Sequence, residues 1–290
     1  MRIVEITYRY DLDTNAEQAP PPDADTARRR LDEGSRAFAN MIEQLGQGEG
    51  TSRRVIHVDP GDLGLSSDDR GAPKQKPFAA VLGCSDARVP IELIFNEGLN
   101  DLFVVRVAGN ALGDDVLGSL KYAVDHLAGS LKLIVVLGHS GCGAVSTAVD
   151  VFLNPAESLS LASKHILRKI VDRLLVVVHA SAKRMTTLFG ADVVKRPGYR
   201  DALIETAVAM NAALTAHTLE QQLRDGDAQG LRAVYGVYLL AGRQIWAPDS
   251  ESADASRLAD PPGDPEGFVR LSDAVLRSPR IASLLRSPAA

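Results

Sequence analysis

The sequence contains only two cysteines, Cys84 and Cys142, among its 290 residues. Small disulfide-rich secreted proteins carry many more, so that class is excluded. The count alone leaves open one disulfide between these two residues. The first residues mix charges with apolar side chains and lack the apolar core of a secretory signal. We therefore expect a cytoplasmic protein that retains both thiols.

Long apolar runs and a surplus of positive charge are also missing. A run such as Leu174–Val178 is far shorter than the roughly 20 apolar residues that cross a bilayer, so we expect no membrane span. The net charge of −5 argues against a nucleic-acid-binding protein, which needs a clustered positive field. At 45% apolar and 24% charged residues, the composition is that of a folded globular chain.

Short aliphatic runs alternate with helical patterns, and this alternation predicts an α/β fold. The clearest helical pattern, Asp114–Leu127, places its apolar residues on one face. We predict a mainly parallel sheet flanked by helices, with an antiparallel edge strand formed by the last hairpin. The predicted strands are 78–82, 102–107, 133–137, 233–239 and 244–246.

The chain is predicted to have three parts. Residues 1–25 form an N-terminal arm with a Pro-rich linker, and residues 26–246 form the main domain, which includes a long helical insertion around 154–199. Residues 247–290 form a loop and a helix around 269–285. An amphipathic helix starts at Thr26, with its apolar stripe at Leu31, Phe38, Ile42 and Leu45. Because the preceding residues cannot cover this stripe, we expect a second subunit to cover it.

Two segments carry the chemistry, GCSDARVP at 83–90 and GHSGCGAV at 138–145. Each directly follows a predicted strand, and the carboxyl ends of parallel strands meet at one crevice. We therefore expect Cys84, His139 and Cys142 to converge. Two thiolates and one imidazole suit tetrahedral zinc and leave one position for water.

Each cysteine has a simpler interpretation as a small buried apolar residue. The joint pattern argues against that interpretation, because a cysteine at a helix start favours the thiolate that binds metal.

These motifs resemble those of β-class carbonic anhydrases, whose pattern is CxDxR followed by HxxC. The similarity continues through FVVRVAGN, SLKYAV and YGVYLLAGRQIW, so it covers about residues 31–246. The resemblance implies that Cys84, His139 and Cys142 are zinc ligands, and that the catalytic pair is Asp86 and Arg88. It also implies a homodimer or a higher homo-oligomer.

The resemblance assigns roles to further residues. Asp86 is expected to orient the attacking water, and Arg88 to keep the Asp86 carboxylate ionised. In another state implied by the family, Asp86 leaves Arg88 and becomes the fourth zinc ligand, which predicts a steep rise of activity with pH. Gln75 stands where plant-type members carry a substrate-binding glutamine. Gly109 and Asn110 are predicted to line the substrate pocket, although a plain strand-to-helix turn explains them equally well.

The predicted function is the zinc-dependent, reversible hydration of carbon dioxide to bicarbonate and a proton, a lyase reaction. Two alternatives stay open. The same site could hydrolyse carbonyl sulfide or carbon disulfide, or the chain could be a catalytically silent zinc protein that binds a partner or senses bicarbonate. The presence of both Asp86 and Arg88 argues against a silent protein.

Overall fold

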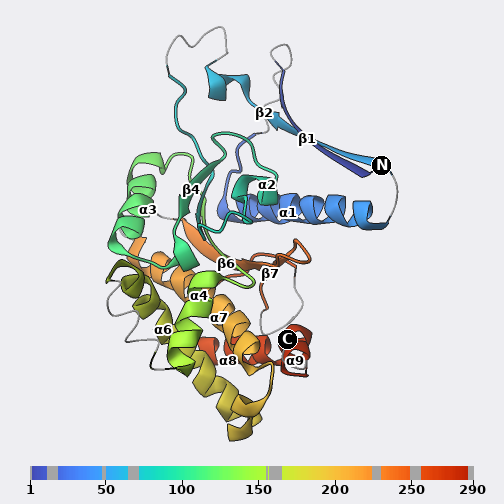
Figure 1. Ribbon diagram of the computed structural model, residues 1–290. Helices are drawn as coiled ribbons and strands as arrows, with labels where there is room; N and C mark the ends of the chain where they lie inside the picture. Colours follow the sequence, from blue (N-terminus) through green and yellow to red (C-terminus); the bar gives the residue numbers. More distant parts are fainter. Residues whose placement is uncertain are drawn as a thin grey trace.

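A five-stranded sheet forms the centre of the computed structural model (Figure 1). The structure describes residues 2–11, 19–47, 50–64, 72–154, 156, 165–223, 230–248 and 256–286. The strand order is β4-β3-β5-β6-β7, with the first four strands parallel and the last antiparallel. The strands are β3 (Ala79–Gly83), β4 (Leu102–Arg106), β5 (Leu133–His139), β6 (Arg232–Tyr238) and β7 (Ile245–Trp246). The predicted α/β class and sheet are confirmed.

Helices cover both faces of this sheet, so its central strands are almost purely aliphatic. Alternate residues of β5 point to opposite faces: Ile134 and Val136 pack in one apolar core, and Leu133 and Val135 in the other. The first core lies under α3 (Asp114–Leu127), α4 (Gly143–Leu153), α6 (His165–Phe189) and α7 (Tyr199–Leu223). The second core lies under α1 (Ala24–Gln47) and α2 (Ile91–Phe95). Among the described helices, none has the length and apolarity needed to cross a membrane.

The amphipathic helix α1 is covered by its own chain. The Asp23 side chain accepts a hydrogen bond from the Thr26 amide at 2.7 Å and so caps the helix start. Leu31 and Phe38 are buried in the second core against the sheet and α2. The expectation that α1 needs a second subunit to cover its stripe is therefore wrong. The Leu45 side chain lies outside the described part of the chain.

The N-terminal segment forms a strand, which the sequence analysis did not predict. β1 (Arg2–Tyr10) pairs in parallel with β2 (Gly50–Val58), and α1 connects the two strands. This two-stranded ribbon lies beside α1 at the end of the molecule opposite the C-terminal helices (Figure 1). The division into arm, domain and tail stays a prediction.

The C-terminal segment forms two helices, α8 (Pro265–Arg277) and α9 (Pro279–Arg286), where one was expected. Pro279 forces Ser278 into an extended conformation, with ψ at 148°, and this breaks the helix. Both helices pack on α7, and α8 also contacts α6.

Three 3-10 helices complete the described elements: η1 (Pro60–Leu63), η2 (Ala108–Asn110) and η3 (Ala191–Lys195).

Candidate metal centre

Two neighbouring strands and one helix start bring the three predicted metal ligands together. Cys84 follows the last residue of β3, His139 is the last residue of β5, and β3 pairs with β5. Cys142 is the N-cap residue of α4. All three side chains are buried, and their ligand atoms lie within 4.8 Å of one another. Both cysteines are free thiols, so the alternative of a disulfide between them is excluded in this structure.

The donor atoms fit a tetrahedral zinc ion. Zinc–sulfur bonds of about 2.3 Å at the tetrahedral angle place two sulfurs about 3.8 Å apart. The Cys84 and Cys142 sulfurs are 3.9 Å apart. The His139 Nδ1 atom lies 3.0 Å from the Ser140 carbonyl oxygen and so donates to it, which leaves the lone pair on Nε2. That Nε2 atom is buried and has no hydrogen-bond partner among the described residues.

The two thiols differ strongly in acidity because they hydrogen-bond to each other. The contact with Cys142 lowers the pKa of Cys84 to about 4 and raises the pKa of Cys142. The Gly109 amide also donates to the Cys84 sulfur, at 3.3 Å. The Cys84 sulfur is therefore stabilised as a thiolate, the form that binds metal.

Asp86 lies beside this group and is held by Arg88. The Arg88 Nε and Nη2 atoms donate to the two carboxylate oxygens at 2.9 and 2.7 Å, and the Arg88 amide donates to Oδ1 at 2.9 Å. These bonds hold the pKa of Asp86 well below its usual range. The Asp86 Oδ2 atom is 3.8 Å from His139 Nε2. An ionised carboxylate thus faces the position that a metal would occupy.

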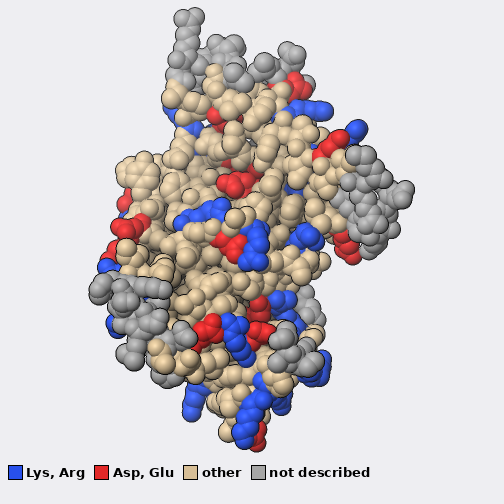
Figure 2. All heavy atoms as spheres, in the orientation of Figure 1, with Lys and Arg blue, Asp and Glu red and all other residues tan. Residues whose placement is uncertain are grey.

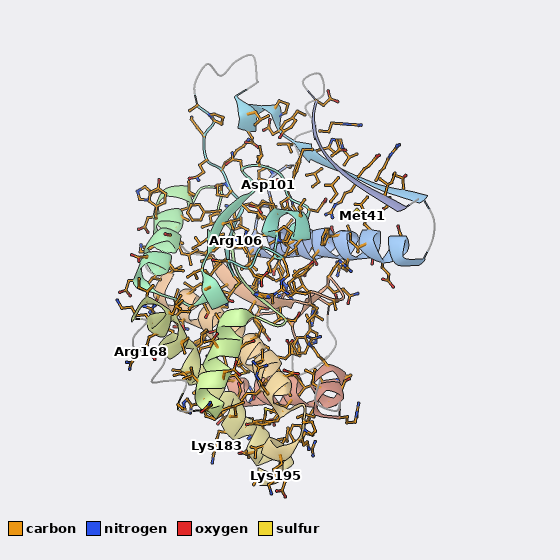
Figure 3. The ribbon with its side chains drawn as sticks, viewed as in Figure 1. Met41, Asp101, Arg106, Arg168, Lys183 and Lys195 are labelled. Carbon is orange, nitrogen blue, oxygen red and sulfur yellow. The ribbon has the colours of Figure 1, made fainter. Side chains whose placement is uncertain are left out.

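Arg106 fixes the loop that carries Cys84 and Asp86, and the sequence analysis did not identify it as a site residue. It is the last residue of β4 (Figure 3). Its Nε atom donates to the Cys84 carbonyl at 3.0 Å, and its Nη2 atom donates to the Asp86 carbonyl at 2.6 Å. Arg106 is the one charged residue in the otherwise apolar run 102–107, and this was the available signal.

Gly109 and Asn110 form part of η2, next to the ligand Cys84. Gly109 has a φ of 65°, and a side chain there would meet Ala144 and Leu174 at 3.0 Å, so the position requires glycine. The Asn110 side chain is buried, and its Nδ2 atom has no acceptor in the described part of the chain. This donor is compatible with substrate binding, which stays a prediction for both residues.

Gln75 is placed differently. It is exposed and precedes the amino end of β3, whereas Cys84 follows the carboxyl end. Five strand residues span about 17 Å, so one chain does not bring Gln75 to the metal ligands. A substrate-binding role for Gln75 stays a prediction.

Three hydrogen bonds from neighbouring elements hold the loop between the predicted ligands His139 and Cys142. The Ser140 amide donates to the Tyr238 carbonyl at 3.0 Å, and the Ser140 hydroxyl accepts from the Leu240 amide at 2.9 Å. The Gly141 amide donates to Glu205 Oε1 on α7 at 2.8 Å. Glu205 was not among the predicted site residues, although it is the one charged residue in the stretch 202–211.

Comparisons with known proteins agree with this geometry. A family model described as carbonic anhydrase matches residues 79–238, which are 160 of the 290 residues. Carbonic anhydrase 2 of Mycobacterium tuberculosis is 54% identical over 100 residues, which cover 34% of this chain and 47% of that protein. The carbonic anhydrase of Mycolicibacterium smegmatis is 38% identical over 139 residues, which cover 48% of this chain and 66% of that protein. The chain thus spans less than two thirds of the length of either relative.

A solved structure supports the fold. The β-carbonic anhydrase CafA of Aspergillus fumigatus superimposes with a TM-score of 0.50 at 20% identity, covering 88% of this chain and 97% of that chain. This likeness concerns the fold alone, whereas the family match includes both metal-ligand motifs. The chain belongs to the β-class carbonic anhydrase family.

Proposed function

We propose that this protein catalyses the reversible hydration of carbon dioxide to bicarbonate and a proton, with a zinc ion held by Cys84, His139 and Cys142. One observation carries the proposal: the ionised Asp86 carboxylate lies 3.8 Å from the unpartnered Nε2 atom of His139, beside the two sulfurs. A purely structural zinc site takes four protein ligands. The described part of the chain offers three, and an oriented acceptor stands next to them.

A bound zinc ion supplies a Lewis acid that turns water into a nucleophile near neutral pH. Asp86 orients this water by accepting a hydrogen bond at Oδ2, which aims an oxygen lone pair at the substrate carbon. Arg88 holds the Asp86 carboxylate ionised and in place through both of its oxygens. The buried Asn110 Nδ2 atom is a candidate donor to an oxygen of bicarbonate.

Stopped-flow measurement of carbon dioxide hydration by the zinc-loaded protein tests this function. We expect turnover that rises between pH 7 and pH 8.5 and that is abolished in Cys84→Ser, which loses a metal ligand. If one zinc is bound per chain and no hydration occurs at either pH, the proposal is wrong. Carbonyl sulfide and carbon disulfide then become the substrates to try, and inactivity on these would leave a silent binding protein.

Assembly and location stay predictions that the same preparation can test. The family resemblance implies a homodimer or a higher homo-oligomer, which sedimentation analysis would detect. A cytoplasmic location without nucleic-acid binding is also expected. Basic and acidic side chains are both present on the visible face of the described residues (Figure 2).

A further inference from the structure

The Glu205 carboxylate connects the C-terminal helix α9 to the loop at residues 139–142, here called the ligand loop. Arg280, in the first turn of α9, donates from Nε and Nη2 to Glu205 Oε2 at 3.0 and 2.5 Å. The other oxygen, Oε1, accepts the Gly141 amide at 2.8 Å. The Glu205 side chain is 9% exposed, so both of its oxygens are used within a largely buried site.

The ligand loop turns at Gly141. This residue lies between the ligands His139 and Cys142, and its φ of 62° turns the chain sharply between them. A hydrogen bond from this amide to an ionised carboxylate is stronger than one to a neutral acceptor. The spacing of the two ligands therefore depends on where the Glu205 carboxylate is held.

The packing of α9 fixes the position of Arg280. Ile281 and Leu285 of α9 are buried in the same apolar core as Cys142. The helix lies so close to the start of α7 that a side chain on Gly198 would come within 1.8 Å of the Leu284 carbonyl oxygen. Helix α9 lies beyond residue 238, where the family match ends.

We propose that Glu205 and Arg280 are positioning residues that hold the ligand loop in its metal-binding form, which makes α9 a structural part of the metal centre. This inference rests on the proposed function only in assuming that the loop binds zinc. Arg280 orients the Glu205 carboxylate, and Glu205 fixes the Gly141 amide. Neither residue is proposed to contact the substrate.

The test compares Glu205→Gln and Arg280→Gln with a matched control, Arg184→Gln. Arg184 on α6 also pairs with a carboxylate through its Nε and Nη2 atoms, which donate to the two oxygens of Asp273 on α8 at 2.6 Å each. Among the described residues, this pair makes no bond to the ligand loop. Zinc affinity and the rate of zinc transfer to a chelator are measured on the full-length protein, together with the melting temperature. The visible spectrum of the cobalt-substituted protein reports ligand geometry independently of activity.

We expect zinc affinity to fall about tenfold or more in Glu205→Gln and Arg280→Gln, the range found when groups that orient metal ligands are removed. The cobalt spectrum should change in both variants. Arg184→Gln should keep the affinity and spectrum of the unmodified protein despite a similar loss of melting temperature. Because the two residues act in series, the double variant should be no weaker in zinc binding than Glu205→Gln.

A variant that changes no charge provides a second test. Gly198→Ala should push α9 away from α7, and we expect it also to speed the loss of zinc. If Glu205→Gln, Arg280→Gln and Gly198→Ala all release zinc at the rate of the Arg184→Gln control, the positioning role is refuted. This outcome is independent of hydration activity, so it is distinct from a failure of the proposed function.

Discussion

Arg88 binds both carboxylate oxygens of Asp86, yet Asp86 Oδ2 stays within 3.8 Å of His139 Nε2. The carboxylate is thus held next to the metal ligands without occupying the metal position. The Arg88 side chain is 63% exposed, whereas that of Asp86 is 16% exposed. Solvent therefore reaches this ion pair on its Arg88 side.

Asp86→Asn should lower the kcat/KM for carbon dioxide hydration by about 100-fold, because an amide lacks the charge that orients the attacking water. Zinc content should not change, since Asp86 is not needed to hold the metal. Stopped-flow kinetics and zinc analysis measure the two quantities. Asp150→Asn, which breaks an ion pair with Arg200 elsewhere on the protein, serves as the control. A variant with undiminished activity would show that Asp86 has no part in the reaction.

Arg88→Lys should shift the rise of activity to higher pH. An ammonium group cannot reproduce the two parallel bonds of the guanidinium, so Asp86 is released more easily toward the metal position. A higher pH is then needed before water displaces it. A pH–rate profile from pH 6 to 9 measures the midpoint, and an unchanged midpoint, or a flat profile in the unmodified protein, would contradict the Asp86 switch.

The sheet and the convergence of Cys84, His139 and Cys142 could be predicted because both depend on local sequence. Runs such as Leu133–Leu137 are aliphatic throughout, as buried parallel strands require, and each motif begins at the carboxyl end of a strand. The ribbon of β1 and β2 could not be predicted in this way. Its pairing joins residues 48 apart, such as Arg2 with Gly50, and no local periodicity encodes such a contact.

The two residues that hold the ligand loop, Glu205 and Arg280, were harder to predict for the same reason. Glu205 is 64 residues from Gly141, and Arg280 is 75 residues from Glu205. Only the fold shows that they touch. The covering of α1 by its own sheet was also missed, because the amphipathic pattern shows that a face is buried but not which surface buries it.

Arg106→Gln should destabilise the loop that carries Cys84 and Asp86. The substitution removes charged donors to two carbonyl oxygens, and each such bond contributes about 1.5–3 kcal/mol at most to stability. We expect a lower free energy of unfolding together with faster loss of zinc to a chelator. Arg243→Gln, which removes an exposed arginine whose Nη1 atom donates to the Ala241 carbonyl, is the control. Zinc loss at the same rate in both variants would contradict a supporting role for Arg106.

We expect the loss of a proton from Glu97 to lower the stability of the protein at alkaline pH. Glu97 is 2% exposed and pairs with Arg30 of α1, and burial raises its pKa from 4.5 to about 8 despite that partner. Between these two values the folded chain binds more protons than the unfolded chain, so the free energy of unfolding falls as pH rises. The contribution is complete below pH 4.5 and is lost as the pH passes through about 8.

Urea unfolding at pH 6 and pH 9 measures this contribution. We expect the free energy of unfolding to drop by about 2 kcal/mol more in the unmodified protein than in Glu97→Gln, whose amide does not titrate. Glu92→Gln changes an exposed residue of the neighbouring helix α2 and should keep the full pH dependence. An equal drop in Glu97→Gln and in the unmodified protein would mean that Glu97 stays ionised beside Arg30 throughout this range. The ion pair, and not burial, would then set the charge at the contact between α1 and the loop that follows α2.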